Sequence, residues 1–296
     1  MAGIADRESL VKKASYLRIA ARDLSEGMKS GNFRSLYRGQ GIEFSGVRDY
    51  IRGDDIRSID WNVTARMGRP YVKIFEEERE LQIFIVVDSS LSMQLGTDNR
   101  TKYETAAEAA ALVTIAAEMN GCPVGAVFFD GAIHFSCAPQ LGREQTMLIL
   151  TRLDKLPEKS QTGSVLGNAL TGAGKLLKKR SLVFVLSDFR SGEWEKPLIS
   201  LAHKNDVVAM RLMDKFDEKL PAIGTVPFQD TESKLTMLLP TSSEKFKKEW
   251  RIQNESRTKQ WRELCVKHGV MPVILNTTDE VLQVLSSVFN QKTTAR

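Results

Sequence analysis

Two short stretches of the chain are almost wholly apolar, and each ends abruptly in polar residues. Residues 83–87 (IFIVV) precede Asp88, and residues 182–186 (LVFVL) precede Ser187 and Asp188. Apolar runs of this length without polar alternation are typical of strands buried on both faces, as in the middle of a parallel sheet. The pattern therefore predicts two central strands, each with a carboxylate at its carboxyl end.

Helix and strand patterns alternate along most of the chain after residue 81. Helical spacing predicts helices over residues 103–119, 143–153, 165–179, 194–204, 243–268 and 280–289, and apolar or alternating runs predict strands over 123–129, 132–136, 207–212 and 270–275. The Asp130-Gly131 pair between two of these strands is a hairpin signal. The alternation predicts an α/β fold with a doubly wound, mostly parallel sheet flanked by helices.

Two segments depart from this alternation. Residues from about 219 to 240 are expected to form an inserted hairpin. Near the N-terminus, apolar positions at three- and four-residue spacing over residues 7–28 predict an amphipathic helix. The segment that follows, residues 33–80, is rich in Gly, Arg and Asp and predicts short strands and tight turns; we call it the preamble. We therefore expect an N-terminal extension over residues 1–79 and an α/β domain over residues 80–292.

Composition and charge narrow the class of protein. Hydrophobic residues make up 42% of the 296 positions, and no apolar run approaches the roughly 20 residues that span a bilayer. The first residues lack the order of a signal peptide, so we expect a cytoplasmic protein without a membrane span. The net charge of +5 is interleaved with acidic residues, which favours a solvated surface over nucleic-acid binding. Cys122, Cys137 and Cys265 lie far apart and are expected to be reduced packing residues.

Polar side chains suited to a metal ion follow the first apolar strand. Asp88, Ser90 and Ser92 stand at alternate positions, at the end of the strand where open α/β sheets bind ligands. One carboxylate and two hydroxyls form a set of hard oxygen ligands suited to Mg²⁺ or a similar cation. The alternative is that Asp88 caps a turn and the serines only decorate it.

Two further segments offer ligands to this cluster. Asp188 follows the second apolar strand, and the carboxyl ends of neighbouring strands converge on one place. Thr162 and Ser164 lie in the loop before the helix predicted from residue 165. Their alternative role is to cap that helix, for which Ser164 is well placed.

Signatures of catalysis do not accompany these residues. The histidines, His134, His203 and His268, are isolated from one another and from the cysteines, so surface or packing roles are expected. The chain has no Walker phosphate-binding loop, no dinucleotide-binding glycine motif and no nucleophile elbow. We therefore expect neither catalytic residues nor a nucleotide cofactor.

The segments that carry these oxygen ligands resemble a von Willebrand factor A domain. The resemblance rests on the Asp-x-Ser-x-Ser motif after a buried strand, a hydroxyl before a Gly-Asn-Ala-Leu helix, and Leu-Ser-Asp after the second apolar strand. This is the pattern of that family's metal-ion-dependent adhesion site, in which a threonine stands in the chain between the Asp-x-Ser-x-Ser motif and the later aspartate. The resemblance implies a von Willebrand A or Rossmann-like fold and a site for Mg²⁺, or for Mn²⁺ or Ca²⁺. Its implied ligands are Asp88, Ser90, Ser92, Ser164 and Asp188, with Thr162 as the alternative to Ser164.

The preamble resembles a more specific family. Residues 48–61 (RDYIRGDDIRSIDW), residues 64–66 and residues 73–78 are similar to a bacterial family of unknown function, DUF58. Its members combine this preamble with a von Willebrand A-like domain, and their genes often neighbour MoxR-type AAA+ ATPases. The resemblance covers roughly residues 30–215. It implies a role as cofactor or adaptor of such an ATPase, with other von Willebrand A proteins as further partners.

Five preamble residues are dense enough in charge to suggest a second site: Asp54, Asp55, Arg57, Asp60 and Trp61. A structural role is favoured, in which Arg57 pairs with a carboxylate and Trp61 packs the preamble onto the sheet.

Taken together, these features predict a non-enzymatic, Mg²⁺-dependent protein-interaction module. Two carboxylates just neutralise a divalent ion, and the hydroxyls leave coordination positions that an Asp or Glu of a partner could complete. The alternative is a metal-dependent phosphoester hydrolase. That chemistry usually needs a nucleophile or a general base near the metal, and neither is evident in the sequence.

Overall fold

The chain divides into two compact units, one formed by Ser35–Glu80 and the other by the rest of the chain. The computed structural model describes Ala21 and residues 43–76, 81–97, 100–155, 165–218, 224–229 and 236–290. Apart from Ala21, the helix expected over residues 7–28 lies outside the described residues.

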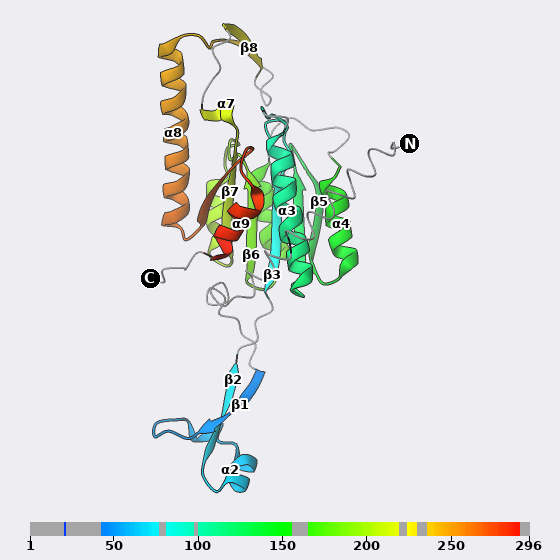
Figure 1. Ribbon diagram of the computed structural model, residues 1–296, viewed down its shortest axis with the longest axis vertical. Helices are drawn as coiled ribbons and strands as arrows, with labels where there is room; N and C mark the ends of the chain where they lie inside the picture. The colour runs from blue at the N-terminus through cyan, green and yellow to red at the C-terminus, as the bar shows by residue number, and fades with distance from the viewer. Residues whose placement is uncertain are drawn as a thin grey trace. The chain divides into compact units, whose positions relative to one another are not determined.

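A six-stranded sheet forms the centre of the larger unit (Figure 1). In spatial order its strands are β10 (Met271–Asn276), β7 (Asp206–Met213), β6 (Ser181–Ser187), β3 (Gln82–Asp88), β4 (Val124–Phe129) and β5 (Ile133–Gln140). Neighbouring strands run parallel except for β5, which pairs antiparallel with β4. The predicted α/β fold with a mostly parallel sheet is therefore confirmed. The two apolar runs form β3 and β6, which are hydrogen-bonded neighbours in the middle of the sheet.

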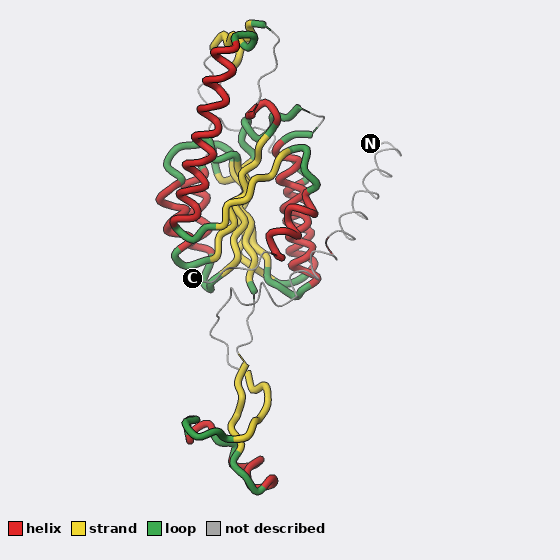
Figure 2. The backbone as a smooth tube through the Cα atoms, turned by 60° about the vertical axis from the view of Figure 1, so that its left-hand side comes forward, coloured by secondary structure: helices red, strands yellow, loops and turns green. Residues whose placement is uncertain are grey.

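Helices cover both faces of this sheet (Figure 2). The helices described in the larger unit are α3 (Lys102–Met119), α4 (Arg143–Leu153), α5 (Leu166–Leu176), α6 (Glu195–Ala202), the short α7 beyond the end of β7 (Lys215–Glu218), α8 (Glu244–Lys267) and α9 (Val281–Asn290). One face carries α3 with α4 and α9 packed beside it, and the other carries α5, α6 and α8. None of the helices in the described part of the chain is long and apolar enough to cross a membrane.

Alternating side chains of the central strands account for this layering. Phe84 and Val86 of β3 join Val183 of β6 in the core that α5, α6 and α8 cover. Phe184 points to the opposite face and contacts Phe289 of α9, with ring centroids 5.9 Å apart. Because successive strand residues face opposite sides, a sheet covered on both faces requires apolar residues at every position.

The inserted hairpin is confirmed within the larger unit. Strand β8 (Thr225–Gln229) pairs antiparallel with β9 (Thr236–Pro240). Helix α8 begins soon afterwards, where the Ser243 side chain accepts a hydrogen bond from the backbone N–H of Phe246. A serine in this position satisfies one of the N–H groups that a helix start leaves without an internal partner.

The smaller unit contains a two-stranded antiparallel sheet and two short helical segments. These elements are β1 (Glu43–Asp49), η2 (Ile56–Ser58, a 3-10 turn), α2 (Trp61–Met67) and β2 (Tyr71–Glu76). The sequence predicted strands and turns here but not α2. Asp60 caps the start of α2, and Gly68 ends it in the left-handed conformation at φ 72°. An aspartate before and a glycine after a segment are the signals that could have revealed this helix.

The charged residues of the smaller unit support its local structure, but in a different pairing from the one predicted. Asp54 forms an ion pair with Arg48 and not with Arg57, with N–O distances of 2.6 and 2.7 Å. Asp55 instead accepts a hydrogen bond from the backbone N–H of Arg57 at 2.9 Å. The side chain of Trp61 is 66% exposed, and its expected packing of the preamble onto the sheet stays a prediction.

The connections of the larger unit create a switch point between β3 and β6. The chain leaves β3 through α3 toward β4, whereas it leaves β6 through α6 toward β7 on the other side. In open α/β sheets, ligands bind beyond the carboxyl ends of the strands at such a reversal. Asp88 ends β3 and Asp188 directly follows β6, so both carboxylates lie at this point.

Candidate functional site

Asp88 is held in place by its own loop and by the neighbouring strand. Its side chain is almost fully buried, with 1% exposed. One carboxylate oxygen accepts a hydrogen bond from the backbone N–H of Ser90 at 2.9 Å, and the other accepts one from the hydroxyl of Ser187 at 2.7 Å. Burial and the negative charge of Asp188 raise the pKa of Asp88 to about 7. A cation placed beside this carboxyl group would stabilise its charged form.

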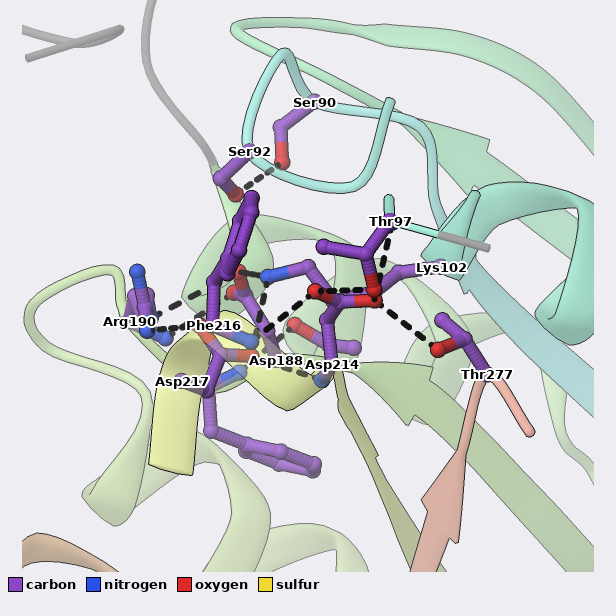
Figure 3. A network of polar contacts seen from close by, with 12 residues as sticks. Ser90, Ser92, Thr97, Lys102, Asp188, Arg190, Asp214, Phe216, Asp217 and Thr277 are labelled. Atoms are coloured by element: carbon purple, nitrogen blue, oxygen red, sulfur yellow. Dashed lines mark hydrogen bonds and ion pairs between the residues drawn. The ribbon is translucent and has the colours of Figure 1, made fainter. Parts of the chain in front are cut away.

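The two predicted serine ligands lie together in the loop after β3. The Ser90 and Ser92 hydroxyl oxygens are 3.2 Å apart, and Figure 3 shows them facing each other. Both side chains are buried. The Ser92 side chain also helps to lower the pKa of Asp188, so this loop lies against the end of β6. The structure therefore brings together Asp88, Ser90, Ser92 and Asp188, as the sequence predicted.

Asp188 differs from Asp88 because positive charges surround it. Its Oδ1 accepts a hydrogen bond from the backbone N–H of Arg190 at 3.2 Å, and its Oδ2 lies 3.0 Å from the ammonium group of Lys102. Burial alone would raise the pKa of Asp188, but the charges of Lys102 and Arg190 outweigh burial and hold the pKa below its ordinary value.

Lys102 is a residue of the site that sequence reasoning missed. It is the first residue of α3, only 2% exposed, and its Nζ also lies 3.5 Å from Asp217 Oδ2 (Figure 3). Asp217 in turn forms an ion pair with Arg190. Lysine is almost never fully buried unless it is paired. The available signal was a lysine in the first turn of a helix, where the helix dipole disfavours a positive charge.

Asp214 forms a second buried cluster beside the site. It follows β7 and accepts hydrogen bonds from the backbone N–H and the hydroxyl of Thr97, and from the hydroxyl of Thr277 (Figure 3). The backbone N–H of Phe216 also donates to it. These bonds fasten the end of the Ser90–Ser92 loop to the carboxyl ends of β7 and β10.

One histidine contacts the same loop. The Ser89 hydroxyl donates to the carbonyl of Phe129 at 2.8 Å and lies 2.9 Å from Nε2 of His134. Because the single hydroxyl proton of Ser89 goes to the carbonyl, His134 is the donor in the second contact. His134 as a whole residue is exposed on β5, while partial desolvation of its ring lowers the pKa of the imidazole. Its surface position agrees with the expectation from the sequence.

The oxygen donors of this site fit a hard divalent cation. Two carboxylates and two hydroxyls converge, and a buried carboxyl group with a raised pKa is stabilised in its charged form by a nearby cation. No group of three or more His, Cys, Asp and Glu side chains is placed to hold a metal in the described residues, so the hydroxyls would have to complete the ligand set. Thr162 and Ser164 lie outside the described residues, and the choice between them stays a prediction.

Comparison with known proteins decides the family. A family model described as a protein of unknown function, DUF58, matches residues 46–260. The chain belongs to the DUF58 family. It is 30% identical over 233 residues to the uncharacterized protein Rv1480 of Mycobacterium tuberculosis, covering 78% of this chain and 74% of that protein. The same figures hold for the uncharacterized protein Mb1516 of Mycobacterium bovis.

Solved structures with a similar chain path come from several proteins. The conserved hypothetical protein BatB of Bacteroides thetaiotaomicron is 16% identical with a TM-score of 0.44, covering 70% of this DUF58 chain and 96% of that chain. An aerotolerance-related membrane protein of Bacteroides fragilis is 15% identical with a TM-score of 0.47, covering 72% and 98%. The SpRpn10 VWA domain is 13% identical with a TM-score of 0.39, covering 71% and 95%.

Proposed function

We propose that this DUF58 chain is a non-enzymatic protein-interaction module that uses a divalent cation, foremost Mg²⁺, to hold a carboxylate of its partner. The convergence of Asp88, Ser90, Ser92 and Asp188 at the switch point between β3 and β6 carries the proposal. Buried hydroxyls and carboxylates that meet where open α/β sheets bind ligands are suited to a metal-assisted binding site.

The charges of the site support binding rather than cleavage. Asp88 and Asp188 supply two negative charges, and the serine hydroxyls are neutral. A bound divalent cation would supply a Lewis-acidic centre with coordination positions left for an outside oxygen ligand. Asp88 and the serines would orient that centre, while Asp188 stays charged because Lys102 lies 3.0 Å away. An acidic side chain of a partner is the ligand that this arrangement favours.

The resemblance of the preamble to DUF58 proteins whose genes neighbour MoxR-type AAA+ ATPases suggests the partner. The chain would act as an adaptor or cofactor of such an ATPase, and other von Willebrand A proteins are further candidates. No membrane span or nucleic-acid surface is needed for this role.

A binding experiment with matched variants tests the proposal. The immobilised full-length chain would be incubated with a MoxR-type AAA+ ATPase of the same organism in Mg²⁺ and then eluted with EDTA. Asp88→Asn and Ser90→Ala should each weaken binding by at least about tenfold. Asp206→Asn is the control, because it removes the same charge from an exposed ion pair with Arg180 at the amino end of β7.

Two results would contradict this function. Binding that is equally strong in Mg²⁺ and in EDTA, and unchanged in the Asp88 and Ser90 variants, would show that the site does not hold the partner. Hydrolysis of a phosphoester by the unchanged protein, lost in Asp88→Asn but kept in Asp206→Asn, would favour the hydrolase alternative.

A further inference from the structure

A lysine side chain competes with any cation for the candidate site. The Lys102 ammonium lies 3.0 Å from Asp188 Oδ2, one of the oxygens that a metal would use. The lysine is 2% exposed and Asp188 is 3% exposed, so water screens their interaction weakly. A divalent cation at the same carboxylate would meet the lysine charge at short range in a medium of low dielectric constant.

A second carboxylate, that of Asp217, lies within reach of the Lys102 ammonium group. Asp217 Oδ2 is already 3.5 Å from Nζ, on the short helix α7. Arg190 bridges the same two carboxylates, with ion pairs to both Asp217 and Asp188. A small movement of Nζ toward Asp217 would free Asp188 Oδ2 and still leave the lysine paired. The lysine could make this change without leaving its buried position.

The position of Lys102 in its helix indicates that the pairing is what holds it there. A positive charge in the first turn of a helix opposes the helix dipole, and a buried charge without a partner is strongly destabilising. The α3 start is already capped by Thr101, whose hydroxyl accepts from the N–H of Glu104. The side chain of Lys102 therefore has no part in capping the helix. Its side chain is explained by Asp188 and Asp217.

From this geometry we infer that Lys102 is a positioning residue that sets the affinity of the site for divalent cations. Its ammonium neutralises Asp188 when no metal is bound, and it transfers its contact to Asp217 when a cation takes Asp188. The inference rests on the proposed metal site and adds the residue that controls its occupancy. The lysine thereby keeps intrinsic metal affinity low.

Direct metal binding to the full-length protein tests the inference. Mn²⁺ binding would be measured by electron paramagnetic resonance and Mg²⁺ binding by calorimetry, for the unchanged chain and for Lys102→Met. The methionine keeps an unbranched side chain that is one atom shorter, and it removes the charge. We expect it to bind Mn²⁺ at least about tenfold more tightly. Lys175→Met, at an exposed position of α5, is the control and should leave the affinity unchanged.

Thermal unfolding guards against a variant that simply folds poorly. Lys102→Met leaves Asp188 and Asp217 without their buried lysine, so its melting temperature should fall in EDTA. In Mg²⁺ the melting temperature of the same variant should recover much of this loss, whereas that of the unchanged chain should rise less. A destabilised variant whose melting temperature does not respond to Mg²⁺ or Mn²⁺ would overturn the inference.

A double-mutant cycle separates the effect of Asp217 that acts through Lys102 from its direct electrostatic effect on the metal ion. Asp217→Asn removes the negative charge of the second acceptor, and it should weaken metal binding because Asp188 is then the only one of the two that can form an ion pair with Lys102. If this effect acts through the lysine, it should shrink in the Lys102→Met background. An effect of equal size in both backgrounds would show that the charge of Asp217 acts directly on the metal ion. It would contradict the transfer of the lysine contact.

The outcomes also distinguish this inference from the proposed function. If the unchanged chain and Lys102→Met bind Mn²⁺ equally well, the inference fails and the metal-dependent partner site stands. If Lys102→Met binds more tightly but partner binding ignores EDTA, the inference stands and the proposed function fails. If neither protein binds a divalent cation, both fail.

Discussion

Single residues at the switch point show how strongly surroundings decide the state of a buried group. Asp88 and Asp188 end neighbouring strands, yet the pKa of Asp88 is raised to about 7 and that of Asp188 is lowered. Burial acts on both carboxyl groups, but Lys102 and Arg190 compensate only Asp188. The two predicted ligands are therefore not equivalent: Asp188 keeps its charge, and Asp88 is the carboxyl group that gains most from an added cation.

A residue in the smaller unit gives a prediction about pH. The hydrogen bond from Arg48 and that from the backbone N–H of Ile51 lower the pKa of Asp54 from 3.8 to about 2. The unfolded chain therefore takes up this proton at higher pH than the folded unit does. The contribution of the pair to stability should be complete above pH 3.8 and be lost as the pH falls toward 2. A titration of the carboxyl carbons by NMR should place the Asp54 midpoint near 2.

Variants of two arginines check the cause of this shift. Arg48→Gln should return the Asp54 midpoint toward 3.8. Arg69→Gln should leave it in place, because Arg69 contacts Asp49 instead. A midpoint near 3.8 in the unchanged protein would contradict the role of the ion pair.

At the scale of elements, a buried aspartate fastens segments that are distant in sequence. Asp214 follows β7 and binds Thr97, 117 residues away, and Thr277, 63 residues away. Thr97 ends the described part of the loop that carries Ser90 and Ser92, and Thr277 directly follows β10. One carboxylate thus holds the candidate site loop against two strands on the same side of the switch point.

Removing this carboxylate should destabilise the larger unit. Asp214→Ala should lower the free energy of unfolding by about 3 kcal/mol, because several buried donors lose a charged acceptor. Thr277→Val removes a single hydroxyl donor of the same cluster and should cost only about 1 kcal/mol. Urea denaturation followed by circular dichroism measures both values. Equal losses for the two variants would mean that Asp214 is not the common anchor of these segments.

At the scale of the whole molecule, the larger unit depends on the apolar layer between the sheet and α5, α6 and α8. Cys265 of α8 lies in this layer with 0% of its surface exposed, beside Trp261 and Leu198. Burial raises the pKa of its thiol to about 12. The thiolate, which is the form that reacts with alkylating agents, is therefore scarce in the folded protein. Reaction of the Cys265 thiol with an alkylating agent would therefore indicate that this apolar layer has opened.

The chemical reactivity of Cys265 should report on global unfolding. In native buffer at mildly alkaline pH, mass spectrometry should show Cys265 unmodified by iodoacetamide over times that fully label it in urea. Increasing urea should expose the thiol together with the loss of the circular dichroism signal. Cys122, which is only partly buried, serves as the internal comparison and should react first. Rapid native labelling of Cys265 would contradict the packing of α8 on the sheet.

Local patterns in the sequence predicted much of the larger unit. The apolar runs of β3 and β6, the hairpin of β4 and β5 and the inserted hairpin of β8 and β9 all form as expected. Each of these features depends on residues close together in the chain, whose periodicity or turn chemistry records which faces are buried. The short helix α2 was missed because seven residues between two caps give little periodicity to detect.

Only the tertiary structure decided which charges meet. The sequence placed Asp88, Ser90, Ser92 and Asp188 at two strand ends, and the parallel pairing of β3 with β6 brings those ends together. It could not reveal that Lys102 reaches Asp188 across 86 residues of the chain. Local periodicity depends on neighbours in sequence, whereas the partner of a buried charge depends on which elements the fold places side by side.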